Sequence, residues 1–107
     1  MMIFISHPYD GSKSDRVKIK NLIKTIAKVE SEHTCVSPTL SFGFMEGSID
    51  KQLMEDFRID LLMMCDKVYF FGDIDSSKEC KIDLKMCRRL KIPYTIFKRK
   101  DKQTKPE

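Results

Sequence analysis

The segment that most constrains the fold of this chain spans residues 66–93, DKVYFFGDIDSSKECKIDLKMCRRLKIP. It begins with an apolar run, Val68–Phe71, which leads into a turn at Gly72. A helical pattern then extends from about Ser77 to Leu90 and ends before Pro93. A buried strand, a glycine turn, a hydroxyl cap and a helix in this order are typical of one strand-to-helix unit of an α/β protein. In such units the functional groups lie at the turn, where strand C-termini and helix N-termini meet.

Asp83 breaks the pattern of this helix. The apolar stripe consists of Cys80, Leu84, Cys87 and Leu90. Asp83 falls inside that stripe, and a carboxylate on the buried face of a helix is costly unless another group pairs with it or uses it. Asp83 is therefore the first candidate for chemistry. The structural alternative is an ion pair with a basic residue at the helix flank, such as Lys81.

The rest of the chain repeats the same alternation of strands and helices. Three further strands are expected at residues 2–7, 33–37 and 93–97, and two further helices at about residues 14–30 and 49–65. This order predicts a single-domain, doubly wound α/β fold of the flavodoxin-like or Rossmann-like kind. It has a four-stranded parallel sheet, right-handed crossovers and three helices. The 107 residues suit one domain. We expect it to cover residues 1–99, and residues 100–107 to form a charged, disordered tail.

Composition narrows the classes of protein that the chain can belong to. No apolar run approaches the ~20 residues that a membrane span needs, and the strand-like start argues against a signal peptide. The two histidines stand alone and the cysteines have no CxxC spacing, so we expect neither a metal site nor a cofactor. Reduced core thiols in a cytoplasmic protein are the simplest interpretation of the cysteines. These are Cys35, Cys65, Cys80 and Cys87.

The net charge of +4 is concentrated in the first expected helix and at the end of the chain. The simplest interpretation is a solvated helix face and a frayed tail. Attraction of a phosphate-bearing small molecule is the next alternative. Nucleic-acid binding is the weakest of the three, because no aromatic residues alternate with the basic ones.

A ligand crevice is expected at the carboxyl ends of the parallel strands. Three segments meet there: Ser6–Gly11, the loop after Ser37, and Gly72–Ser77. The loop of residues 39–48 is long enough for a substrate wall or lid, or for an Ω-like loop that packs its own aromatics. Either Ser76 or Ser77 caps the last helix, whose free N–H groups could bind an anion, although most such caps serve only their own helix. The candidate ligand-binding residues are Ser6, His7, Pro8, Asp10, Gly11, Phe42, Gly72, Asp73, Ser76, Ser77 and Glu79.

Two further residues are candidates to assist Asp83. Asp60 lies at the edge of the apolar stripe of the second long helix, and Tyr9 lies in the first loop. A partly desolvated carboxylate can act as nucleophile or general base, and a second acid or a tyrosine can orient it. This combination suits attack at a sugar anomeric carbon, where an anion stabilises an oxocarbenium-like transition state. The alternative for Asp60 is pairing with Arg58 or with a neighbouring strand.

The chain also resembles the nucleoside 2-deoxyribosyltransferase-like superfamily, which includes deoxynucleotide N-glycosidases and many small phage-encoded proteins. The similarity covers about residues 2–97. It is carried by IFISHPYDG at the first strand and its nucleoside-binding loop, by Ser37-Pro38 with Leu40 and Phe42, by DFRIDLLMMCDKVYFFGD, and by SSKECKIDLKMCRRLKIP. The resemblance implies a nucleoside or nucleotide pocket and places Asp83 where the family carries its glutamate nucleophile. Asp83 is one methylene shorter, and Glu79 replaces a family glycine, which puts turnover in question.

A second resemblance is to Toll/interleukin-receptor (TIR) domains. These domains share a Phe-Ile-Ser-like first strand and a Ser-x-x-Cys-x-x-Glu-Leu pattern, which Ser77, Cys80, Asp83 and Leu84 match with aspartate for glutamate.

Three alternative functions follow from these residues and resemblances. The chain cleaves or transfers at the N-glycosidic bond of a (deoxy)nucleoside or nucleotide; it binds a nucleotide without turnover, to sequester or sense it; or it is a TIR-like NAD-cleaving or protein-interaction domain. A homodimer or higher homo-oligomer is also expected, because so small a sheet exposes much apolar surface.

Overall fold

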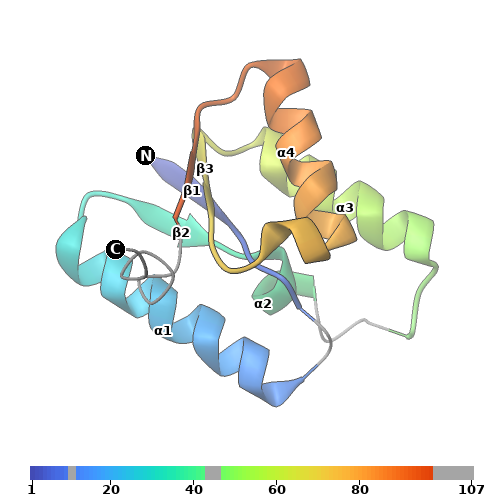
Figure 1. The fold of residues 1–107 in the computed structure, drawn as a ribbon, viewed down its shortest axis with the longest axis horizontal. Helices are drawn as coiled ribbons and strands as arrows, with labels where there is room; N and C mark the ends of the chain where they lie inside the picture. Colours follow the sequence, from blue (N-terminus) through green and yellow to red (C-terminus); the bar gives the residue numbers. More distant parts are fainter. Residues whose placement is uncertain (10–11, 43–46, 98–107) are drawn as a thin grey trace, which may run out of the picture.

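The computed structural model describes residues 1–9, 12–42 and 47–97, and Figure 1 shows its fold. The strands are β1 (Met2–Ser6), β2 (Thr34–Val36), β3 (Lys67–Phe70) and β4 (Tyr94–Ile96). The helices are α1 (Lys13–Val29), α2 (Pro38–Phe42), α3 (Lys51–Met63) and α4 (Lys78–Leu90), and a 3-10 turn, η2 (Ile74–Ser76), precedes α4.

The four strands form one parallel sheet in the order β2-β1-β3-β4. This arrangement confirms the expected doubly wound α/β fold. Figure 1 shows α1 on one side of the sheet and α3 and α4 on the other. After β1 the chain forms β2 on one side of β1, and it then crosses to form β3 on the other side of β1. The strand order therefore reverses between β1 and β3. In open α/β sheets, ligands bind beyond the carboxyl ends of the strands at this point.

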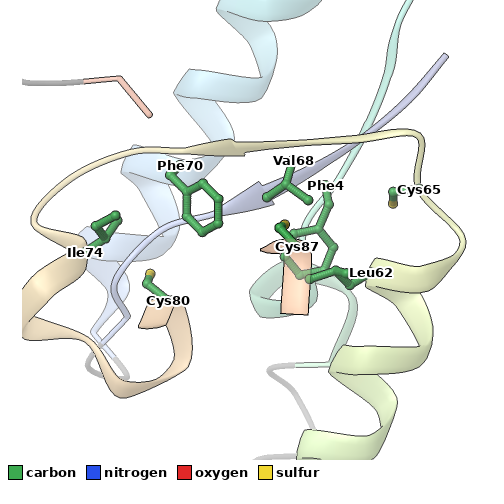
Figure 2. Packing of buried hydrophobic residues seen from close by; sticks show 8 residues of the cluster. All are labelled: Phe4, Leu62, Cys65, Val68, Phe70, Ile74, Cys80 and Cys87. Atoms are coloured by element: carbon green, nitrogen blue, oxygen red, sulfur yellow. The ribbon is translucent and has the colours of Figure 1, made fainter. Parts of the chain in front are cut away.

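The larger part of the core lies between the sheet and the pair α3 and α4. Alternate residues of β1 and β3 point to this face, because side chains in a strand alternate between the two sides of a sheet. Figure 2 shows how these side chains pack against residues of the two helices and of η2. The buried cluster consists of Phe4, Leu62, Cys65, Val68, Phe70, Ile74, Cys80 and Cys87.

The smaller part of the core lies beneath α1. Ile3 and Ile5 of β1 and Tyr69 of β3 pack against Ile26 of α1. The Tyr69 hydroxyl donates a 2.7 Å hydrogen bond to Glu30 Oε1, just after the end of the helix. This hydrogen bond fixes the C-terminal end of α1 on the sheet.

The helix boundaries follow from local capping. Ser77 caps α4 by accepting a 3.2 Å hydrogen bond from the Cys80 amide. Ser76 instead donates its hydroxyl to the Asp73 carbonyl within η2. Of the two serines proposed as caps, Ser77 is therefore the cap of α4. The helix ends at Leu90, and its C-cap residue, Lys91, adopts a left-handed conformation with φ 58°.

The main difference from the sequence-based expectation lies after β2. We expected a loop over residues 39–48, but Pro38–Phe42 form the short helix α2. Ser37 precedes this helix, and its hydroxyl accepts a hydrogen bond from the Leu40 amide at 3.3 Å. Proline is favourable at the first helical position, because the N–H that it lacks has no partner there. A serine followed by proline was therefore a helix-start signal that the expectation of a loop overlooked.

Candidate functional site

Asp83 is fully buried, and its carboxylate is paired with Arg58 of α3. Arg58 Nε donates to Oδ1 at 3.0 Å and Nη2 donates to Oδ2 at 2.6 Å. The hydroxyl of Ser6, at the end of β1, donates to the same Oδ2 at 2.7 Å. The group that stabilises this carboxylate is therefore an arginine of the neighbouring helix, whereas Lys81, the partner suggested by the helix flank, is exposed.

Arg58 is the residue of this site that the sequence analysis missed as a partner of Asp83. Its side chain is 14% exposed, and its guanidinium carbon lies 5.7 Å from the centre of the Phe4 ring. Burial lowers the pKa of Arg58, but the charge and hydrogen bonds of Asp83 outweigh this effect, and the pKa lies above its ordinary value. The arginine therefore stays charged. Arg58 lies in the apolar stripe of α3, and Asp83 lies in the apolar stripe of α4. Opposite charges in the stripes of two successive helices are the sequence pattern that indicates their pairing.

A cleft of about 360 Å³ opens next to this ion pair. Arg58 lines the cleft, whereas Asp83 does not. Phe42 contributes an aromatic wall, and its ring packs against Phe57 with 5.5 Å between centroids. Both signs of charge occur at the cleft, on Lys51, Glu55, Lys78 and Glu79. The cleft thus presents cations, acids and an aromatic face. The carboxylate of Asp83 does not line it and lies behind Arg58.

The segment after β1 brings His7 and Tyr9 to the cleft. His7 Nδ1 lies 2.6 Å from the Pro8 carbonyl oxygen. Because a carbonyl can only accept, Nδ1 is the donor in this hydrogen bond. A methyl group on Gly72 would come within 3.0 Å of Pro8 Cδ and 3.5 Å of His7 Nε2. Gly72, with φ of +80°, therefore allows the segments after β1 and β3 to approach closely.

Only some of the other predicted site residues line the cleft. Tyr9, His7, Phe42 and Glu79 line the cleft. Ser6 is fully buried and its hydroxyl is used by Asp83, so the structure does not present it to a sugar. Asp73 and Ser76 are exposed, and Ser77 is buried at the start of α4. Asp10 and Gly11 lie outside the described residues.

The structure does not place Asp60 beside Asp83. Asp60 is exposed, so the expectation that it borders buried surface is wrong. Residues two positions apart on a helix do not share a face, and it is Arg58 that turns toward α4. Asp60 makes no hydrogen bond or ion pair with any residue in the described ranges, so the alternative pairing with Arg58 is also wrong.

Searches of protein-family models, of curated proteins and of solved structures found no match to this chain. Within residues 1–9, 12–42 and 47–97, no cluster of three or more histidine, cysteine or acidic side chains is placed to hold a metal ion. Over the same part of the chain, no helix has the length and apolar character that crossing a membrane requires.

Proposed function

We propose that this chain is a nucleoside- or nucleotide-binding module that holds its ligand in the cleft without breaking the N-glycosidic bond. The observation that carries this proposal is the burial of Asp83 behind Arg58. A nucleophile or general base must come within about 3 Å of the atom that it attacks or deprotonates. Both oxygens of Asp83 are already engaged by protein donors, and the carboxylate has no exposed surface.

Freeing Asp83 for chemistry would be costly. Separating a buried arginine from its carboxylate leaves two uncompensated charges in a low-dielectric interior, which costs several kcal/mol. The cleft geometry therefore supports binding better than turnover. The one-methylene shortening relative to the glutamate of the resembled superfamily points in the same direction, because a shorter acid can stay in the core.

The cleft offers groups that suit the parts of a nucleotide. Phe42 can stack on a base, since every base has a π-face. Lys51 and Lys78 are exposed cations that can pair with a phosphate. Arg58 uses Nε and Nη2 for Asp83, and no residue in the described ranges accepts from Nη1, whose donors can therefore bind a ligand oxygen. Because Asp83 balances the charge of Arg58, we expect Arg58 to recognise a neutral acceptor such as a base carbonyl or sugar hydroxyl.

The proposal is tested by calorimetry and chromatography on one panel of deoxynucleosides, their monophosphates and NAD. We expect at least one compound to bind and to be recovered intact after prolonged incubation. Lys78→Gln should weaken binding of a phosphorylated ligand, whereas Lys85→Gln should leave it unchanged. Lys85 is a matched control because it is an exposed lysine on the same helix that does not line the cleft.

Two results would overturn the proposal. Release of free base by the wild-type chain, abolished in a folded Asp83→Asn variant, would establish catalysis instead. Failure of every compound on the panel to bind would remove the nucleotide class altogether and favour a TIR-like role based on protein contacts. Circular dichroism of each variant separates loss of the fold from loss of the site.

A further inference from the structure

Among the described residues, helices cover only part of one face of the sheet. Parallel sheets are normally buried on both faces by helices. On the α1 side, Ile26 of the helix packs in one buried cluster with Ile3, Ile5 and Tyr69. Beyond it the rings of Phe71 and Phe97 stack with 4.7 Å between centroids, and 38% of Phe97 is exposed. No other helix within the described ranges packs on this part of the sheet (Figure 1).

The uncovered area forms an apolar groove of about 340 Å³ between α1 and the β3–β4 edge. Its apolar lining residues are Leu22, Ile26, Val29, Tyr69, Phe71 and Phe97. Val29 is 75% exposed and lines the same groove as Phe71 and Phe97, and contiguous exposed apolar surface is typical of an interaction site. The one acidic side chain of the groove, Glu30, already accepts the Tyr69 hydroxyl. The groove therefore offers apolar contacts and little hydrogen bonding.

The α1 wall of this groove is strongly basic. The helix carries six lysines and arginines and a single acidic residue, and all six cations are exposed: Lys13, Arg16, Lys18, Lys20, Lys24 and Lys28. Lys18 lies four residues before the groove residue Leu22, and Lys28 lies three residues after the groove residue Thr25. Side chains at these spacings are neighbours on a helix surface. Cations therefore flank the apolar groove along α1.

We propose that this groove binds an amphipathic α-helix of another protein, with an apolar stripe that enters the groove and acidic residues along the flank facing α1. The apolar floor of the groove favours the apolar stripe of the partner helix. The lysines of α1 favour acidic over basic residues along the flank of that helix. A helix is the natural occupant, because it covers the open half of the sheet as α1 covers the other half. Amphipathic helices that lie in apolar grooves are a recurrent mode of recognition.

The composition of the final residues of the given sequence does not match this occupant. These residues, 98–107 (KRKDKQTKPE), contain five basic residues and no apolar side chain apart from proline. In a second copy, the surface that surrounds the groove is again the basic α1, so two copies meet with like charges. Charge complementarity therefore favours an acidic partner helix over self-association.

The test uses two designed helical peptides with the same leucine stripe, one with glutamate flanks and one with lysine flanks, labelled for fluorescence anisotropy. The acidic peptide should bind at micromolar concentration, and its affinity should fall as salt is raised, since salt screens exposed charges. The basic peptide should bind at least about tenfold more weakly. Equal affinity of the two peptides, or no binding of the acidic one at millimolar concentration, would refute the proposal.

Matched valine variants locate the binding surface. Val29→Glu places a charge in the groove and should weaken the acidic peptide about tenfold or more. Val17→Glu is the control, because Val17 is 50% exposed on the same helix and does not line the groove. Lys18→Glu should weaken the acidic peptide and strengthen the basic one. Sedimentation of the peptide-free protein completes the test: a dimer disrupted by Val29→Glu but not by Val17→Glu would replace the partner helix with a second copy.

Discussion

Arg58 of α3 and Asp83 of α4 form a two-point contact, with Nε–Oδ1 at 3.0 Å and Nη2–Oδ2 at 2.6 Å. Asp83 is fully buried and Arg58 nearly so. The contact joins the two helices on one side of the sheet, and Ser6 ties it to the end of β1. Protein donors thereby engage both carboxylate oxygens of Asp83, and Arg58 lines the cleft.

The first prediction concerns the stability of this pair. Asp83→Ala should lower the free energy of unfolding by about 3–5 kcal/mol, because it leaves a charged arginine buried without its partner. Urea unfolding followed by circular dichroism measures the change. The double variant Arg58→Met, Asp83→Leu should recover most of the loss, since apolar residues can replace a buried pair. A single-variant loss below about 1 kcal/mol would instead fit an unpaired functional carboxylate.

The second prediction concerns Gly72. Gly72→Ala should destabilise the fold by about 2–3 kcal/mol, through a left-handed backbone and a contact of 3.0 Å with Pro8 Cδ. Gly47→Ala is the matched control, because Gly47 has a similar φ of +82° but nothing within 4 Å of the added methyl group. The control should cost only about 1 kcal/mol. Equal losses in thermal unfolding would show that the approach to Pro8 contributes nothing.

The third prediction concerns pH. The hydrogen bond to Glu30, followed by burial, raises the pKa of Tyr69 to about 12. An unfolded tyrosine titrates near 10, so the folded state holds this proton more tightly. The contribution to stability is therefore complete below about pH 10 and is lost as the pH rises from about 10 toward 12. Tyr69→Phe should remove this part of the loss of stability at alkaline pH. In the variant, absorbance at 295 nm should show one fewer tyrosine with a raised pKa.

Tyr69→Phe also has an effect at neutral pH. It removes one hydrogen bond to a partly exposed acceptor, so we expect a loss of about 1 kcal/mol. Tyr94→Phe serves as the comparison, because Tyr94 is exposed on β4 and its hydroxyl has no hydrogen bond within the described part of the chain. A similar alkaline profile for the two variants would contradict the assignment to Tyr69.

The fourth prediction concerns thiol reactivity. Burial raises the pKa of Cys65 and Cys87 to about 11 and also raises that of Cys80, so few of these thiols are ionised at neutral pH. Cys35 is half-buried, although burial raises its pKa as well. Iodoacetamide at pH 8 should therefore modify Cys35 first in the native protein, and all four cysteines in urea. Early labelling of Cys80 would show that the α4 contact with the sheet opens readily.

Much of the fold could be predicted from local patterns. Alternation of apolar runs with helical stripes is a local property, and it predicted the four strands, the three long helices and the parallel sheet. Ser77 was correctly included among the caps, since hydroxyl capping depends on neighbouring residues only. The short helix α2 was missed because five residues give too little periodicity to distinguish a helix from a loop.

The candidate site was predicted less completely. Asp83 was recognised as anomalous, because one helix suffices to show that it lies in an apolar stripe. Its partner was not recognised, since Arg58 and Asp83 are 25 residues apart and meet only when α3 and α4 pack side by side. Asp60 was placed wrongly for a related reason: a position at the edge of a stripe does not say on which side the neighbouring helix will lie.

The sequence alone therefore determined that Asp83 needs a partner, because the cost of a buried charge follows from helical periodicity and solvation. Only the tertiary structure decided which group that partner is. The packing of α3 against α4 delivers a guanidinium to both carboxylate oxygens, and the end of β1 adds the Ser6 hydroxyl. That decision belongs to long-range contacts, because the groups that meet at Asp83 come from α3 and β1, which are far from it in the sequence.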